Sequence, residues 1–147
     1  STWPDNRHVR FVKRSHGEAC GPETEVLLVD SLGELLDFYA GADVAFVGGS
    51  LVPIGGHNLL EPAALGIPAL TGPHNFNSLD VARLLEARGA AEIVPDGTAL
   101  GARVAALLSD SAARERMGAA GRASVEENRG ALEKLLGLID PLLRISA

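Results

Sequence analysis

A glycine-rich loop between an apolar run and a helical pattern constrains the fold of this chain most. Residues 43–47 are apolar enough to predict a buried strand, and residues 58–65 carry a helical pattern. Four glycines lie between them: Gly48, Gly49, Gly55 and Gly56. Glycine lets a backbone approach a ligand closely, and a helix start offers N–H groups and the positive end of its dipole. We therefore predict an anion site here, with a nucleotide or phosphorylated ligand as the first hypothesis.

The polar residues of this loop support two interpretations. Glycines after a strand also form tight turns without any ligand. Asn58 and Glu61, three residues apart, fit a helix cap with a reciprocal carboxylate. Glu61 could instead accept hydrogen bonds from paired hydroxyls, as a carboxylate does with ribose. A single side-chain rotamer of Glu61 is not expected to do both.

Apolar runs and helical patterns alternate along the rest of the chain. Such alternation predicts right-handed βαβ units, and thus an α/β fold with a Rossmann-like parallel sheet flanked by helices, in one domain over residues 1–147. The run at 25–30 is continuous enough for a strand buried on both faces. Ser31, with Glu34 three residues on, is expected to cap the next helix. The expected strands are 9–14, 25–30, 43–47, 68–71 and 91–94, and the expected helices are 31–40, 58–65, 77–88, 98–109, 111–128 and 131–139.

The composition excludes several classes of function. The net charge is −6 and the one basic cluster spans residues 7–14, so nucleic acid is not an expected partner. Cys20 is the sole cysteine, and His57 and His74 lack a ligand pattern, so no metal is expected. No apolar run approaches the roughly 20 residues of a membrane-spanning helix. Because 46% of the residues are hydrophobic and only 4% aromatic, the core must be aliphatic.

Four motifs in order resemble one enzyme family. They are the segments 30–35 (DSLGEL), 42–51 (ADVAFVGGSL), 55–64 (GGHNLLEPAA) and 72–77 (GPHNFN). Together they are similar to the C-terminal half of the 3-deoxy-D-manno-octulosonic acid (Kdo) transferases. The resemblance is continuous from about Arg10 to about Arg88. It implies the C-terminal half of a two-domain GT-B glycosyltransferase, which would carry the donor CMP-Kdo.

The resemblance also implies which residues bind the donor. In the family, the Gly-Glu-Leu and Asn-x-x-Glu segments contact CMP. The matching residues here are Gly33, Glu34, Leu35, Asn58, Leu59, Leu60 and Glu61. From position alone, we expect a loop on the sugar and phosphate side of the donor, formed by Gly48, Gly49, Ser50, Gly55, Gly56 and His57. The motifs at 30–35 and 48–58 both follow predicted strands, which agrees with one shared site beyond the strand ends.

The resemblance further implies what this chain lacks. The family's acceptor site, membrane-associated surface and glutamate base belong to a preceding domain that nothing here matches, and residues 1–8 show no match. We therefore expect a soluble donor domain that is inactive alone and has no catalytic residue and no cofactor. The whole enzyme would move Kdo to a lipid A precursor in lipopolysaccharide synthesis, on the cytoplasmic side of the bacterial inner membrane. A stand-alone nucleotide-binding module, or the donor domain of another nucleotide-sugar transferase or epimerase, is the alternative.

Overall fold

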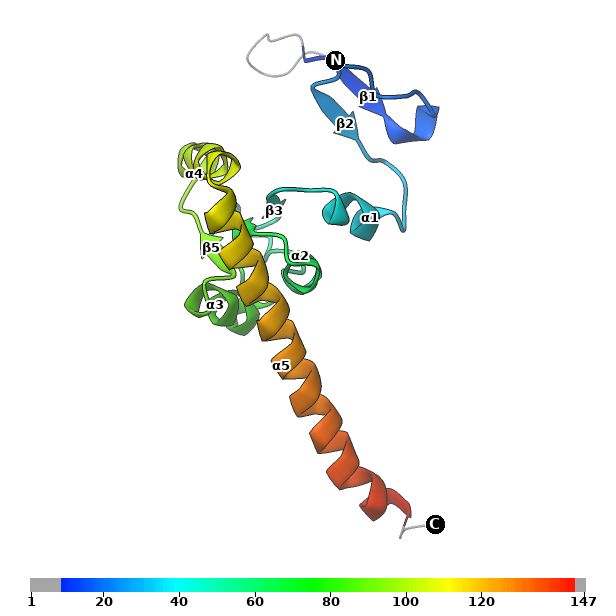
Figure 1. Cartoon of the computed structure of the whole chain (residues 1–147), viewed down its shortest axis with the longest axis vertical. Coiled ribbons are helices and arrows are strands. Elements are labelled where there is room, and N and C mark those ends of the chain that lie inside the picture. The colour runs from blue at the N-terminus through cyan, green and yellow to red at the C-terminus, as the bar shows by residue number, and fades with distance from the viewer. Residues whose placement is uncertain (1–8, 145–147) are drawn as a thin grey trace. The chain divides into compact units, whose positions relative to one another are not determined.

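The computed structural model describes the backbone of residues 9–144 and the side chains of residues 9–131 (Figure 1). The chain divides into two compact units, one ending at Leu35 and the other beginning at Leu36. Each unit contains parallel strands, which confirms the predicted α/β class. The strands belong to two small sheets, however, and not to one continuous sheet.

The N-terminal unit is built on two short parallel strands. Strand β1 (Phe11–Lys13) pairs with β2 (Val26–Leu28), and a 3-10 turn, η1 (Arg14–His16), follows β1 directly. The prediction that the second strand is buried on both faces is wrong: Val26 and Leu28 are 42% and 45% exposed. A continuous apolar run predicts burial only when helices cover both faces of the sheet. The described part of this unit contains no α-helix that could do so.

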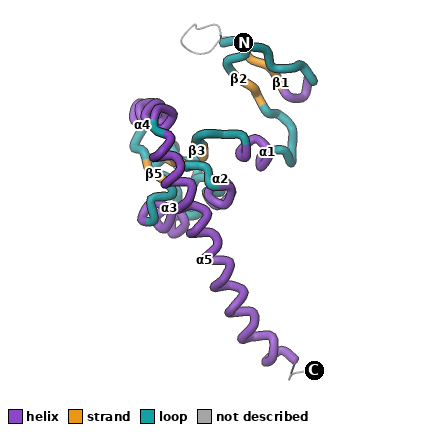
Figure 2. Tube along the Cα trace, in the orientation of Figure 1, coloured by secondary structure: helices purple, strands orange, loops and turns teal. Residues whose placement is uncertain are grey.

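The C-terminal unit holds a three-stranded parallel sheet in the order β3-β4-β5. Its strands are β3 (Ala45–Val47), β4 (Ala69–Thr71) and β5 (Ala91–Ile93). Figure 2 shows the helices: α1 (Leu35–Ala40) precedes β3. Helices α2 (Leu60–Leu65), α3 (Leu79–Ala87) and α4 (Gly97–Ser109) follow β3, β4 and β5 in turn, and α5 (Ser111–Arg144) follows α4. Each strand end therefore leads into a loop and a helix, as the alternating pattern predicts.

Helices cover both faces of this sheet. Neighbouring side chains of a strand point to opposite faces, and accordingly Ala69 and Leu70 of β4 belong to two separate apolar clusters. One cluster joins the sheet to α2 and α3, and its buried members are Val47, Leu59, Ala63, Ala69, Ala82, Leu85, Ala90 and Ala91. The other joins the sheet to α4 and the start of α5 through Leu70, Leu107, Ala113 and Met117. Both clusters are aliphatic, as the composition predicts.

Helix α5 differs from its prediction. Two helices were expected, over 111–128 and 131–139, but one helix runs from Ser111 to Arg144. A glycine inside a helix costs only about 1 kcal/mol relative to alanine, so Gly130 alone does not end it. Proline can bend a helix without terminating it, and the described backbone continues for three residues beyond Pro141.

The helix that carries Glu61 is held against α5 by glycines. A Cβ on Gly118 would lie 2.1 Å from the carbonyl oxygen of Gly66, and a Cβ on Gly121 would lie 2.9 Å from that of Ala63. The backbones of α2 and α5 therefore approach more closely than any side chain would permit. Arg122 adds a hydrogen bond from its Nη1 to the carbonyl oxygen of Leu65 at 3.3 Å. Helix α2 thus has a fixed place on the core.

Candidate functional site

The start of α2 orients the Glu61 carboxylate. Asn58 accepts a hydrogen bond from the Leu60 amide at Oδ1, 3.0 Å away, and donates from Nδ2 to Glu61 Oε1, 3.1 Å away. The helix begins two residues later than predicted, yet Asn58 still satisfies one of its unpaired amides. Only one carboxylate oxygen is used, since Glu61 Oε2 has no hydrogen-bond partner among the described residues. Glu61 thus contacts the side chain of Asn58 and accepts from no backbone amide among the described residues, so the expected reciprocal cap is not formed and Oε2 is available to a ligand.

The same helix start offers fewer free amides than a helix N-terminus normally does. The amide of Leu60 is taken by Asn58, Pro62 has no N–H, and the amide of Ala63 donates to the Leu59 carbonyl at 3.4 Å. In the described structure, the backbone amide of Glu61 is therefore the first-turn N–H that none of these contacts uses. A phosphate near α2 would therefore need donors from the neighbouring glycine loop as well.

The two leucines of the Asn-x-x-Glu segment differ from its polar residues. Leu59 is fully buried in the core cluster beside Val47 and Ala63. Leu60 is 38% exposed and borders a mainly apolar hollow of about 370 Å³ between α2, α3 and α5. Asn58 and Glu61 are therefore the side chains of this segment that can make polar contacts with a ligand.

Tyr39 on α1 belongs to the surroundings of Glu61. Its pKa is raised above the ordinary tyrosine value, first because the side chain is partly buried and second because the charge of Glu61 disfavours the phenolate. The hydroxyl thus stays protonated and remains a hydrogen-bond donor near a carboxylate. No sequence motif pointed to this residue.

A buried serine ties the two loops that follow β3 and β4. Ser50 is fully buried, and its hydroxyl donates to the Val47 carbonyl at 2.7 Å and accepts from the Gly72 amide at 2.8 Å. The carbonyl of Ser50 also accepts from the His74 amide at 2.9 Å. The structure thus places Ser50 beneath the loop surface, where it holds the loop together, and its side chain is not exposed to a donor sugar.

The backbone conformation of this loop explains why it contains glycines. Gly55 and Gly56 have φ of 116° and 75°, and a Cβ on Gly55 would lie 2.2 Å from the Asn77 amide nitrogen. The amide of Gly56 donates to the Gly49 carbonyl at 2.8 Å, which folds the loop back on itself. Exposed His57 lies against Gly49, where an added Cβ would meet its ring at 3.2 Å. This packing brings all the candidate loop residues of the C-terminal unit to the carboxyl edge of β3 and β4.

The Gly-Glu-Leu segment lies at the end of the N-terminal unit, in a loop that ends at α1. Ser31 was expected to cap a helix over 31–40, but the helix begins at Leu35. Two features of the structure account for the difference. Gly33 has a φ of 87°, which interrupts any helical run, and the Ser31 hydroxyl donates to the Glu34 carboxylate while accepting from no helix amide among the described residues. Arg14 holds the same carboxylate in an ion pair of 2.8 Å.

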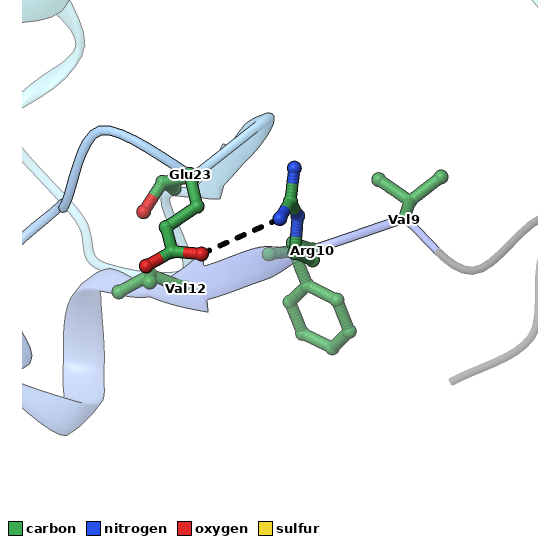
Figure 3. A pocket seen from close by; sticks show the side chains of 6 residues that line it. Val9, Arg10, Val12 and Glu23 are labelled. Atoms are coloured by element: carbon green, nitrogen blue, oxygen red, sulfur yellow. Dashed lines mark hydrogen bonds and ion pairs between the residues drawn. The ribbon is translucent and has the colours of Figure 1, made fainter.

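A second hollow of about 370 Å³ lies beside β1, and Figure 3 shows the side chains that line it. Arg10 extends along it and pairs with Glu23 at 3.4 Å and with Glu25 at 3.8 Å. Because its charged groups are already paired with each other, this hollow is a poor candidate for a ligand site. The part of the chain that the structure describes also contains no group of three His, Cys, Asp or Glu side chains that could hold a metal ion. In the same residues, no helix is both long and apolar enough to cross a membrane.

Comparison with known proteins identifies the family of this chain. The chain is 47% identical over 135 residues to the 3-deoxy-D-manno-octulosonic acid transferase of Haemophilus influenzae, and 42% identical over 134 residues to that of Bordetella pertussis. These matches span 91% and 90% of this chain. This chain belongs to the Kdo transferase family. It spans about a third of the length of these relatives, 32% and 31% respectively.

Solved structures agree with this relationship. The crystal structure of the C-terminal CMP-Kdo binding domain of WaaA from Acinetobacter baumannii matches with a TM-score of 0.76 and 36% identity, over 80% of this chain and 61% of that one. The spinosyn rhamnosyltransferase SpnG in complex with its aglycone matches with a TM-score of 0.52 and 23% identity, over 86% of this chain and 35% of that one, which supports the fold alone. No protein-family model matches the chain. The predicted membership of the Kdo transferases, with a C-terminal GT-B domain, is therefore confirmed.

Three residues outside the predicted site also shape it, and of these only Asn75 lies within a motif, the segment 72–77. Arg14 and Tyr39 contact or influence the two candidate glutamates, and Asn75 is buried beneath the glycine loop. Asn75 accepts from the Thr71 hydroxyl at 3.0 Å and donates to the Gly72 carbonyl. A sequence signal existed only for Asn75, in a segment rich in turn-forming residues. The partners of Arg14 and Tyr39 are 20 and 22 residues away, beyond the reach of any local pattern.

Proposed function

We propose that this chain is the donor-binding domain of a glycosyltransferase and that its ligand is CMP-Kdo. The observation that carries the proposal is the match to the CMP-Kdo binding domain of WaaA, at a TM-score of 0.76. Sequence identity of 47% to a Kdo transferase over 91% of the chain supports the same assignment. A binding module without any transferase partner has no comparable support.

The geometry suggests a role for each polar group in donor binding. Glu61 Oε2 would accept hydrogen bonds from the ribose hydroxyls, while Asn58 holds the other carboxylate oxygen. Backbone amides of the loop at Gly48 and Gly49 would bind the phosphate, because few amides of α2 remain for it. The Gly33–Leu35 segment would contact the nucleotide as the family resemblance implies.

The complete enzyme would transfer Kdo to a lipid A precursor at the cytoplasmic face of the inner membrane. The transfer is a displacement at the anomeric carbon of Kdo, in which CMP leaves. Amides that neutralise the departing phosphate would stabilise the transition state. We assign the base and the acceptor site to the rest of the enzyme, propose no metal, and expect no turnover by these 147 residues alone.

Calorimetric titration of the chain with CMP, UMP and UDP tests the donor assignment. We expect saturable binding of CMP and affinities at least about tenfold lower for the uridine nucleotides, equivalent to about 1.4 kcal/mol of discrimination at the base. Heat-unfolded chain provides the control for non-specific heats. Equal binding of UMP and CMP would contradict the assignment, as would no binding of either nucleotide.

A further inference from the structure

Two adjacent residues of the 3-10 turn hold both ends of the loop over residues 30–34. At one end, the Ser15 amide donates to Asp30 Oδ1 at 2.9 Å, and the Ser15 hydroxyl donates to Asp30 Oδ2 at 2.7 Å. At the other end, Arg14 donates to Glu34 Oε1 from Nη2 at 2.8 Å and from Nε at 3.2 Å. All these atoms belong to the N-terminal unit.

These contacts leave the middle of the loop free and its ends fixed. The Ser31 hydroxyl donates to Glu34 Oε2, so both oxygens of that carboxylate already have partners inside the unit. Between the fixed ends, Leu32 is completely exposed, and Gly33 has a φ of 87°. Backbone groups at Leu32 and Gly33 are therefore accessible to a ligand, whereas the Glu34 carboxylate is occupied.

The ion pair between Arg14 and Glu34 is only partly shielded from water, so its contribution to the stability of the fold is small. The Arg14 and Glu34 side chains are 50% and 32% exposed. Exposed pairs of this kind contribute little to global stability. The contacts nevertheless lower the pKa of Glu34, chiefly through its hydrogen bond from Arg14, and that of Asp30, chiefly through its hydrogen bond from Ser15. Both carboxylates are thus ionised at neutral pH, and both are suited to fix the loop.

We propose that Arg14 and Ser15 are positioning residues for donor binding: they anchor Asp30 and Glu34 so that the backbone at Leu32 and Gly33 is held ready for the nucleotide. The role of Glu34 is then to anchor the loop, and the main chain beside it makes the ligand contact. This inference rests on the proposed function, because it assumes that the Gly-Glu-Leu segment meets CMP. Arg14 itself touches no ligand.

The principal alternative is that Arg14 attracts the phosphate at long range through its charge. Arg10 provides the matched control, because it lies in the same unit and carries the same charge. Its partners are Glu23 and Glu25, neither of which belongs to the 30–34 loop. Replacing either arginine by alanine removes one positive charge. An effect confined to Arg14 therefore reports the loop contacts and not the net charge.

The test is a set of calorimetric titrations of the 147-residue chain with CMP and with cytidine, which has no phosphate. We expect Arg14→Ala to raise the Kd for both ligands by about tenfold, and Arg14→Lys to recover part of the loss. Glu34→Gln should weaken binding similarly, and the Arg14→Ala/Glu34→Gln double variant should be no weaker than either single variant. Arg10→Ala should change neither Kd more than about twofold.

A measurement without ligand separates this proposal from the proposed function. The heteronuclear NOE of the Leu32 and Gly33 amides should fall in Arg14→Ala and stay unchanged in Arg10→Ala. If the wild-type chain binds CMP while Arg14→Ala leaves both the NOE values and the Kd unchanged, the positioning role is overturned and the donor assignment survives. If the wild-type chain binds no CMP, both proposals fall. Additive losses in the double variant would also contradict the role, since Arg14 would then act independently of Glu34.

Discussion

Replacing Gly118 by alanine is expected to lower the melting temperature of this chain by about 10 °C. The added Cβ would lie 2.1 Å from the carbonyl oxygen and 3.0 Å from the carbonyl carbon of Gly66, both of them backbone atoms. Helix α5 would have to move away from α2, which disturbs the apolar cluster that Ala63 and Ala120 share. Overpacking of this kind costs about 1–3 kcal/mol or more, and each kcal/mol shifts the melting temperature of a chain this size by several degrees.

Thermal unfolding followed by circular dichroism measures this effect, and Gly130→Ala is the matched control. Gly130 lies in the same helix, but a Cβ there would meet nothing within 4 Å. Alanine has the higher helix propensity, so the control should raise the melting temperature slightly. Equal stability of Gly118→Ala and wild-type protein would show that α2 and α5 do not approach as closely as described.

Replacing Glu61 by glutamine is expected to weaken CMP binding by about 10- to 100-fold with little change in stability. A hydrogen bond to a charged group is worth about 1.5–3 kcal/mol, and glutamine loses the charge of the acceptor. The fold should tolerate the change, because the glutamine oxygen can still accept the hydrogen bond that Asn58 donates. Affinity and melting temperature should therefore respond differently.

Calorimetry with CMP and thermal unfolding of the same protein samples test this separation. Asp80→Asn is the matched control, because Asp80 is likewise the acidic residue in the first turn of its helix, α3. It reports the loss of a favourable charge at a helix start, which is worth about 0.3–1 kcal/mol. A drop of several degrees for Glu61→Gln with an unchanged Kd would assign Glu61 to capping alone.

The fold class was predictable because its signals are local. Apolar runs near 45–47, 69–71 and 91–93 alternate with helical patterns, and each became a parallel strand within one or two residues of its expected bounds. Four motifs, at 30–35, 42–51, 55–64 and 72–77, indicated the family, because their residues and their order are read directly from the sequence. Local sequence patterns were therefore sufficient to predict the fold class, the order of the strands along the chain and the candidate loops.

Features that depend on distant contacts were not predictable. The exposure of β2, the merging of two expected helices into α5, and the close approach of Gly118 to Gly66 all depend on what packs against each segment. In the candidate site, too, residues set by local spacing were predictable and residues set by distant contacts were not. Asn58 and Glu61 are found by their spacing, whereas the burial of Ser50 and the pairing of Arg14 with Glu34 appear only when segments 20 or more residues apart meet.

The position of bound CMP in a crystal would decide whether the donor lies at Glu61 and at the loop after β3. We expect a crystal structure of the chain with CMP to show the ribose hydroxyls within hydrogen-bond distance of Glu61 Oε2 and the phosphate at the amides of the loop after β3. Clear density for the nucleotide in the hollow beside β1, lined by Val9, Arg10 and Phe11, with Glu61 still contacting Asn58 alone, would show that Glu61 does not bind the donor.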